Sequence, residues 1–150
     1  GCTLLQTIDC GYSDKTLETL NVTGCSSLKT LVINDSKLRE LDLAGCPSLV
    51  TLTCEHGALQ SLDLSPCKAL SELNCNKNEL TQLDISCCPE ITTVEVPYNR
   101  LSEIDARANK NLEKLDVTYN EAGMNIYLLE SHKAWPFELK KDHDANVFYE

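Results

Sequence analysis

Leu49 to Ala69 reads LVTLTCEHGALQSLDLSPCKA, and the following stretch, Leu70 to Glu90, reads LSELNCNKNELTQLDISCCPE. Both are 21 residues long, and their leucine, cysteine and aspartate positions coincide. A fixed period of this length is typical of a solenoid, in which each repeat forms one coil and buries its apolar side chains against its neighbours. The 21-residue register runs from Leu17 to Asn120 and aligns three columns: Cys25, Cys46, Cys67 and Cys88; Leu28, Leu49, Leu70, Ile91 and Leu112; and Ser36, Gly57, Asn78, Asn99 and Asn120.

Each repeat contains two shorter halves with the same apolar spacing. In the first repeat the first half carries Leu52 and Cys54, and the second half carries Leu62 and Leu64. Alternation with a period of two predicts a short strand in each half. About ten residues that must include a strand and a corner leave no room for a helix. We therefore expect a mainly β solenoid with two parallel sheets, one on each side of the coils.

The register divides the chain into two parts. Residues 1–120 form the predicted solenoid of about five coils, and residues 121–150 form a C-terminal cap of the same domain. The start, Gly1 to Leu5, already has the spacing of Gly24 to Leu28, so the chain begins inside a repeat. We expect that the N-terminus is truncated and that upstream coils or a leader are missing. A lipid-modified Cys2 is the sharper alternative.

The tail holds most of the large aromatic side chains of the chain. Its segments Met124–Leu128 and Asn146–Tyr149 alternate as strands do. We interpret the aromatic residues as a cover for the last coil, because solenoid ends need protection from water. The alternative is an exposed aromatic binding patch.

The chain carries a formal net charge of −10 and has a pI near 4.7. Nucleic acids and anionic membrane surfaces are bound by clustered lysine and arginine, so this balance argues against both partners. No apolar run is long enough to span a bilayer, and we expect no direct membrane insertion.

Nine cysteines occur, and their columns indicate how they are used. Cys54 and Cys75 share a column with Ile33, Val96 and Val117, where cysteine acts as a small apolar side chain. Stacked coils would place the backbones of neighbours in the other cysteine column about 4.8 Å apart, which suits a disulfide, but their parallel Cβ vectors are poorly aimed for one. We therefore expect buried free thiols, with disulfides and metal binding as the alternatives.

An acidic column occupies an outward position on the predicted second strand of each repeat. Bare carboxylates 5 Å apart repel by about 0.8 kcal/mol even in water, so the column needs compensation. Either each side chain accepts hydrogen bonds from the next turn, or a hard cation such as calcium bridges the column. We favour the turn, because the aspartate travels with the framework motif L-D-L/I-S. The column comprises Asn21, Asp42, Asp63, Asp84 and Asp105.

No catalytic constellation emerges from the repeat geometry. His56 lies in a turn, and no nucleophile or acid is placed beside it, His132 or His143. The segment Asp142-His143-Asp144 could be drawn as a metal site, but a solvated turn is the simpler interpretation. We predict no enzyme, no cofactor and no metal site.

The pattern L-x-x-L-x-C-x-x-N-x-L-x-x-L-D-L/I-S-x-C from Leu70 to Cys88 resembles the nested 21-residue leucine-rich repeats, or IRREKO type, of bacterial surface and secreted proteins. The resemblance covers Cys2 to Asn120, and the tail is similar to the closing segment of such proteins. It implies a right-handed leucine-rich repeat solenoid, an extracellular or cell-surface location and a recognition role. It carries over no ligand residues.

The outward positions of the first strand vary from coil to coil, whereas the inward positions stay apolar. We interpret this grid as a binding face for a protein or glycan, and its acidic later half favours a partner with a cationic patch. The alternative is a structural spacer within a larger exported protein that carries a separate catalytic or adhesive domain. The candidate ligand-binding residues are Thr30, Val32, Thr51, Thr53, Glu72, Asn74, Thr93, Glu95, Lys114 and Asp116.

Overall fold

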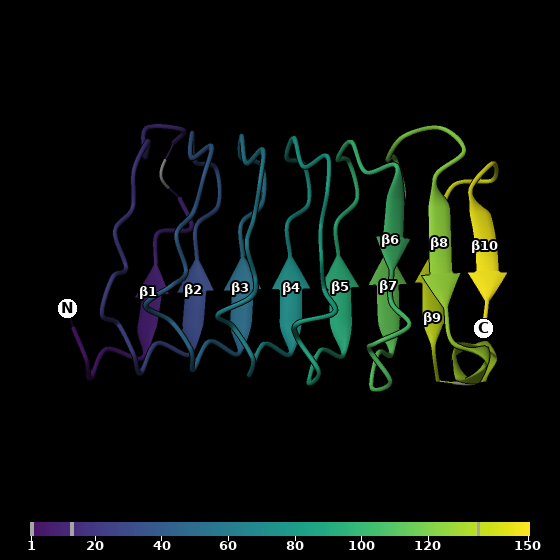
Figure 1. Cartoon of the computed structure of the whole chain (residues 1–150). Helices are drawn as coiled ribbons and strands as arrows, with labels where there is room; N and C mark the ends of the chain where they lie inside the picture. Colours follow the sequence, from purple (N-terminus) through teal and green to yellow (C-terminus); the bar gives the residue numbers. More distant parts are fainter. Residues whose placement is uncertain (1, 13, 135) are drawn as a thin grey trace.

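The computed structural model describes residues 2–12, 14–134 and 136–150 and shows a solenoid of short parallel strands (Figure 1). The strands form two sheets, which we call sheet A and sheet B, and a single 3₁₀ turn, η1 (Glu130–Lys133), is the helical element of the described residues. Sheet A has the order β1 (Thr7–Asp9), β2 (Thr30–Val32), β3 (Thr51–Thr53), β4 (Glu72–Asn74), β5 (Thr93–Glu95), β7 (Lys114–Asp116) and β9 (Glu138–Lys140); sheet B has the order β10 (Asn146–Tyr149), β8 (Asn125–Leu128) and β6 (Glu103–Asp105).

The strand register of sheet A equals the sequence repeat. Thr30 pairs with Thr51, which pairs with Glu72, so each step from β2 to β7 is one 21-residue coil. The central residue of these strands, such as Leu52, points inward and is buried. The mainly β solenoid with parallel sheets that the sequence predicts is therefore confirmed.

Sheet B is shorter than predicted. The second strand expected at Leu62–Leu64 does not form, and β6 is the first strand of this sheet in the described residues. Earlier coils share few backbone hydrogen bonds on this side; Gln60 N–H to Arg39 O is one such bond. An isolated bond does not make a ladder, which needs consecutive pairing. The second side of the early coils is therefore extended chain without a regular sheet.

The tail adds to both sheets. β9 pairs with β7 in sheet A, while β8 lies between β6 and β10 in sheet B. In Figure 1 the yellow-green strands at the C-terminal end continue the stack of coils. The strands expected near Met124–Leu128 and Asn146–Tyr149 are thus present, and the protective role of residues 121–150 stays a prediction. The Trp135 contribution to this cover lies outside the described residues.

The core is a continuous stack of inward side chains from successive coils. Each fully buried leucine contributes about 1.5–3 kcal/mol, which offsets chain ordering only when neighbouring coils stack. None of the helices in the described residues is long and apolar enough to cross a membrane. Side chains at or below 1% exposure recur at the framework positions of the coils that contain β2 to β7: Leu28, Leu31, Leu49, Leu52, Leu70, Leu73, Ile91, Val94 and Leu115.

The asparagine side chains of the repeated column form hydrogen bonds with the backbone of the turns. Asn99 Nδ2 donates to Cys75 O at 2.9 Å and to Val96 O at 3.2 Å, and its Oδ1 accepts from Leu80 N–H at 3.0 Å. Asn78 repeats this pattern one coil earlier. Each amide therefore satisfies backbone groups of two coils that would otherwise be buried without partners.

Candidate functional site

The ten candidate residues lie together on the outer face of sheet A. They occupy the first and last positions of β2, β3, β4, β5 and β7, where the burial pattern shows partly exposed side chains on either side of a buried centre. Their in-register pairing creates two parallel rows. One row is Thr30, Thr51, Glu72, Thr93 and Lys114; the other is Val32, Thr53, Asn74, Glu95 and Asp116.

The middle of this face is slightly hollow. A depression of about 140 Å³ lies over β3, β4 and β5. Thr51 Oγ1 donates to Glu72 Oε2 at 3.5 Å, and Asn74 Nδ2 donates to Glu55 Oε1 at 3.1 Å. These bonds hold polar groups in place at the edge of the depression, so the face offers donors and acceptors that a partner can meet without reordering them.

The later half of the face is less acidic than its carboxylates alone indicate. Lys114 Nζ bridges to Glu95 Oε1, and this hydrogen bond raises the pKa of Lys114. In the next strand Lys140 pairs with Glu138 at 3.4 Å. Two lysines thus offset two carboxylates, and the residual negative charge there comes chiefly from Asp116, whose Oδ1 accepts from Thr118.

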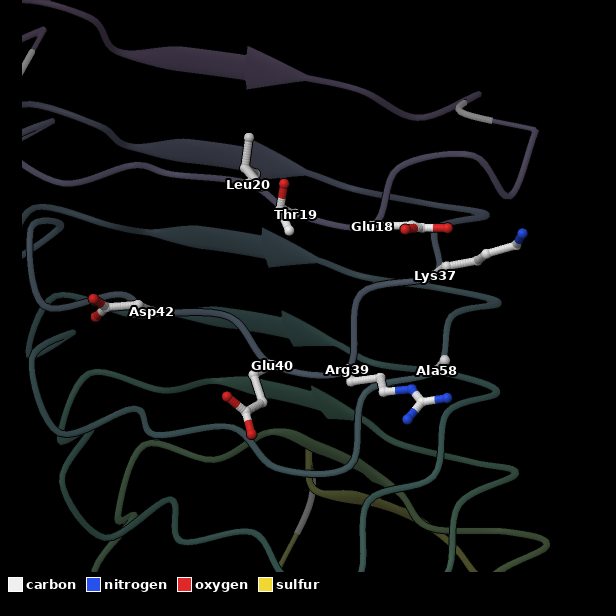
Figure 2. A pocket seen from close by; sticks show the side chains of 8 residues that line it. All are labelled: Glu18, Thr19, Leu20, Lys37, Arg39, Glu40, Asp42 and Ala58. Atoms are coloured by element: carbon white, nitrogen blue, oxygen red, sulfur yellow. The ribbon is translucent and has the colours of Figure 1, made fainter.

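A second, larger depression of about 800 Å³ lies on the opposite side of the early coils (Figure 2). Figure 2 shows Lys37 and Arg39 at one end, with the carboxylate of Glu18 beside Lys37, and the carboxylates of Glu40 and Asp42 toward the other end. The sequence repeat did not predict this depression, which lies on the side of the early coils where sheet B does not form. The depression is wide, and its charged side chains are of both signs and lie in contact with solvent. Its lining residues include no buried polar side chain that could orient a ligand.

The rim at the end of sheet A carries an aromatic pair that the sequence interpretation missed. Tyr98 and Tyr119 stack with ring centroids 4.2 Å apart and planes 11° apart. Both rings are exposed. The signal was available in the repeat, because these residues are 21 positions apart and share one column. We call this pair the tyrosine rim.

The acidic column is explained by turns. Asp63 Oδ1 accepts from Ser65 N–H at 2.8 Å, and this bond lowers the pKa of Asp63. Asp84 does the same with Ser86 at 2.8 Å. The interpretation as turn-forming carboxylates is therefore confirmed, and cations are not needed to account for the column.

Asp142 and Asp144, which the sequence offers as a possible metal site, accept hydrogen bonds from the backbone. Asp142 Oδ2 accepts from Tyr119 N–H at 2.6 Å, and Asp144 Oδ2 accepts from Gly123 N–H at 2.9 Å. Among residues 2–12, 14–134 and 136–150, no three histidine, cysteine or acidic side chains are grouped to hold a metal ion. His132 is buried: its Nδ1 accepts from Leu129 N–H and its Nε2 lies 3.0 Å from Asn109 O.

The cysteines are free thiols, and those in the repeat columns are buried. Burial, followed by the nearby Cys46, raises the pKa of Cys67 to about 12. Burial also raises the pKa of Cys88. Nucleophilic reactivity requires the thiolate, so these side chains are held in their unreactive form. The structure thus confirms the prediction of buried free thiols.

Comparisons with known proteins agree with this architecture. A sequence model of the family described as Leucine Rich repeat matches residues 108–121. The functional domain of InlJ from Listeria monocytogenes, described as including a cysteine ladder, shares the fold with a TM-score of 0.69 and 23% identity over 97% of this chain. Our chain spans 32% of that structure, about a third of its length.

A second solved structure, internalin C2 from Listeria monocytogenes, gives a TM-score of 0.47 at 16% identity and covers 99% of this chain and 76% of that one. No curated protein sequence matches the chain. The 21-residue register, the repeat match and the fold shared with InlJ lead to one conclusion: the chain folds as a leucine-rich repeat β solenoid.

Proposed function

We propose that this chain is a non-enzymatic recognition module that binds a partner protein through the outer face of sheet A. The observation that carries the proposal is the contrast between the two sides of each strand. Inward residues such as Leu52 and Leu73 are constant in type, whereas the outward rows change from threonine to acidic, amide and basic groups along the sheet.

A rigid, varied grid of this kind suits protein recognition. Binding needs ordered polar groups around a surface that can exclude water, and preorganised side chains reduce the entropy lost on association. The hydrogen bonds of Glu72 and Asn74 and the Lys114–Glu95 ion pair provide that order before a partner arrives. The shallow depression over β3–β5 gives the partner a place to seat a side chain.

We place the protein outside a bacterial cell or on its surface, on the strength of the repeat type that the sequence resembles. Two other functions remain to be separated from protein recognition. A glycan could occupy the same face, since its hydroxyl groups would meet the same donors and acceptors. A spacer in a larger exported protein would use the stacked coils without binding through either side.

Labelled chain applied to a protein array and to a glycan array distinguishes the three functions. Protein recognition predicts a saturable hit on the protein array. That binding should be lost in the triple variant Glu72→Lys, Glu95→Lys and Asp116→Lys. Its far-ultraviolet circular dichroism spectrum should stay unchanged, which would show that the fold is intact. A glycan hit would favour the glycan function, and silence on both arrays would favour the spacer.

A matched triple reversal elsewhere controls for the change in net charge. Glu40→Lys, Glu90→Lys and Glu103→Lys alter the charge by the same amount at exposed positions outside sheet A. This control should retain binding. Equal loss in both triple variants would show an unspecific charge effect, and unchanged binding in the sheet A variant would move the site to the second side or to the tail.

A further inference from the structure

The turns that follow β2, β3, β4, β5 and β7 of sheet A each hold a residue in the left-handed backbone region. The φ angles lie between 52° and 58° in five successive coils. Side chains with a Cβ atom are about 1–2 kcal/mol less stable in this region, and glycine or asparagine is the usual choice. Bulky residues kept at such positions point to a role for the side chain. The residues are Asp35, His56, Lys77, Tyr98 and Tyr119.

At the C-terminal end of this column the side chains form an exposed aromatic surface. Tyr98 and Tyr119, the tyrosine rim, are 46% and 59% exposed although their rings stack on each other. Lys77 Nζ lies 5.6 Å from the centre of the Tyr98 ring, on the same rim. The stack therefore already accepts a cation of the chain on its Tyr98 side.

Two other tyrosine rings, those of Tyr127 and Tyr149, each have a cation of the chain over one face. Arg107 lies 5.2 Å from the ring centre of Tyr127, and Lys133 lies 4.5 Å from that of Tyr149. No such cation contacts Tyr119 in the part of the chain that the structure describes. The ring of Tyr119 is therefore exposed and has no lysine or arginine of the described residues over it.

Carboxylates add to the attraction for a cation. Asp142 lies beside Tyr119, because its Oδ2 accepts from the Tyr119 backbone N–H. Partial burial, the hydrogen bond with Tyr119, and the charges of Asp116 and Asp142 raise the pKa of Tyr98. Lys141 Nζ donates to Asp142 O and Ala145 O, and it makes no cation–π contact with the Tyr119 ring among the described residues.

We propose that the tyrosine rim binds an arginine or lysine side chain in a basic segment of a partner protein, with the cation over the exposed ring of Tyr119 and close to the carboxylate of Asp142. This inference rests on the proposed recognition function and adds a partner chemistry to it. The rim lies at the end of β5 and β7, so one partner can occupy both the rim and the outer face of sheet A.

Charge favours a cation over a neutral sugar as the occupant. The mutual stacking of Tyr98 and Tyr119 hides one face of each ring, and a cation on a remaining face gains from nearby carboxylates, whereas a neutral sugar does not. The net charge of −10 also favours a basic partner.

The test uses two short labelled peptides that differ in charge alone. One carries two arginines; the other carries two citrullines, which keep the shape of arginine without its charge. Aromatic resonances of the five tyrosines report binding residue by residue, and fluorescence anisotropy gives the affinity. The arginine peptide should shift the Tyr98 and Tyr119 signals more than those of Tyr12, which is 95% exposed and stands apart from the rim. The citrulline peptide should bind at least tenfold more weakly.

Matched variants separate the rings from the net charge. An exposed cation–π contact contributes a factor of about 2 to 5 in affinity, so Tyr98→Leu/Tyr119→Leu should weaken binding of the arginine peptide by about 2- to 5-fold. Tyr98→Phe/Tyr119→Phe keeps the rings and should bind as tightly as the unchanged protein, as should the control Tyr12→Leu. Equal affinity of the leucine variant and the unchanged protein, or equal binding of both peptides, would overturn the inference.

The triple reversal of sheet A, assayed with the array partner in parallel, separates the two proposals. If that variant loses the partner while the leucine variant keeps it, recognition by sheet A stands and the tyrosine rim has no part in it. If both variants keep the partner, both proposals fail. A glycan that binds the unchanged protein and not the leucine variant would reassign the rim to sugars and overturn the peptide inference.

Discussion

Replacing Asn99 by alanine removes the side chain that joins two coils. Its amide donates to Cys75 O and Val96 O and accepts from Leu80 N–H, and the residue is 8% exposed. Alanine would leave three backbone groups without these partners in a buried turn. Each buried unsatisfied group costs about 1–3 kcal/mol, although water entering the new space recovers part of that loss. We expect the free energy of unfolding to fall by about 3–5 kcal/mol.

Urea unfolding followed by circular dichroism measures this change. Asn120→Ala provides the matched control, because Asn120 makes the same three bonds but is half-buried near the end of the column. Water replaces its amide more easily, so the control should lose about 1–2 kcal/mol. A loss below 1 kcal/mol for Asn99→Ala would refute the role given to the asparagine column. Separate unfolding of the two halves would show instead that the amide transmits cooperativity between coils.

Three further perturbations follow from the structure. Lys77→Gly removes the strain of a left-handed φ of 54°, but it increases the entropy of the unfolded chain and removes the cation–π contact with Tyr98. The net result should be a rise of about 0.5 kcal/mol in the free energy of unfolding. His132→Ala removes the bonds to Leu129 N–H and Asn109 O and leaves a cavity, and should lower it by about 2–4 kcal/mol. The pKa of Cys67 rises from about 9 to about 12, so above pH 9 the unfolded thiol loses a proton that the folded one keeps; stability should fall by about 1.4 kcal/mol per pH unit from this thiol.

Each perturbation has a comparison that isolates its cause. Lys68→Gly, at a position without positive φ, should destabilise the fold; equal effects of the two glycines would contradict the strain argument. His143→Ala, at an exposed residue, should leave thermal unfolding unchanged, and an equal loss there would show a general sensitivity of the tail. Cys67→Ala should reduce the slope of the alkaline decline, measured by urea unfolding in a reducing buffer, by about 1.4 kcal/mol per pH unit, while buried thiols such as Cys88 contribute the remainder. An unaltered slope would assign the decline to other groups.

The inward half of the structure was predictable because it obeys one constraint. A side chain at Leu52 or Leu73 must fill the same space in each coil, so the sequence repeats what the packing repeats. The outward candidates such as Glu72 and Glu95 could be placed for the same reason, since residues beside an inward strand position must point outward. The chemistry of that face was not predictable, because the ion pair of Glu95 with Lys114 depends on side-chain conformations that the repeat does not constrain.

The features that sequence reasoning missed depend on backbone detail. A period of two over Leu62–Leu64 reports which side chains are buried, and an extended segment buries them as well as a paired strand does. The left-handed turn at Tyr98 leaves no mark in a sequence whose turn residues are neither glycine nor asparagine. The burial of His132 likewise depends on the path of the tail, which departs from the repeat.

The change from cysteine to asparagine at the end of one column shows what that column does. Cys88 Sγ lies 3.9 Å from Leu64 O and 3.5 Å from Cys67 O, as a weak donor to both. One coil later, Asn109 Nδ2 reaches the equivalent carbonyl oxygens, Ile85 O at 2.9 Å and Cys88 O at 3.1 Å. A small apolar residue would fill the space without meeting these carbonyl groups. The column therefore requires a compact side chain that donates a hydrogen bond to backbone carbonyl groups, and both a thiol and an amide meet this requirement. From the sequence period alone, the change from Cys88 to Asn109 looks like an interruption of the column.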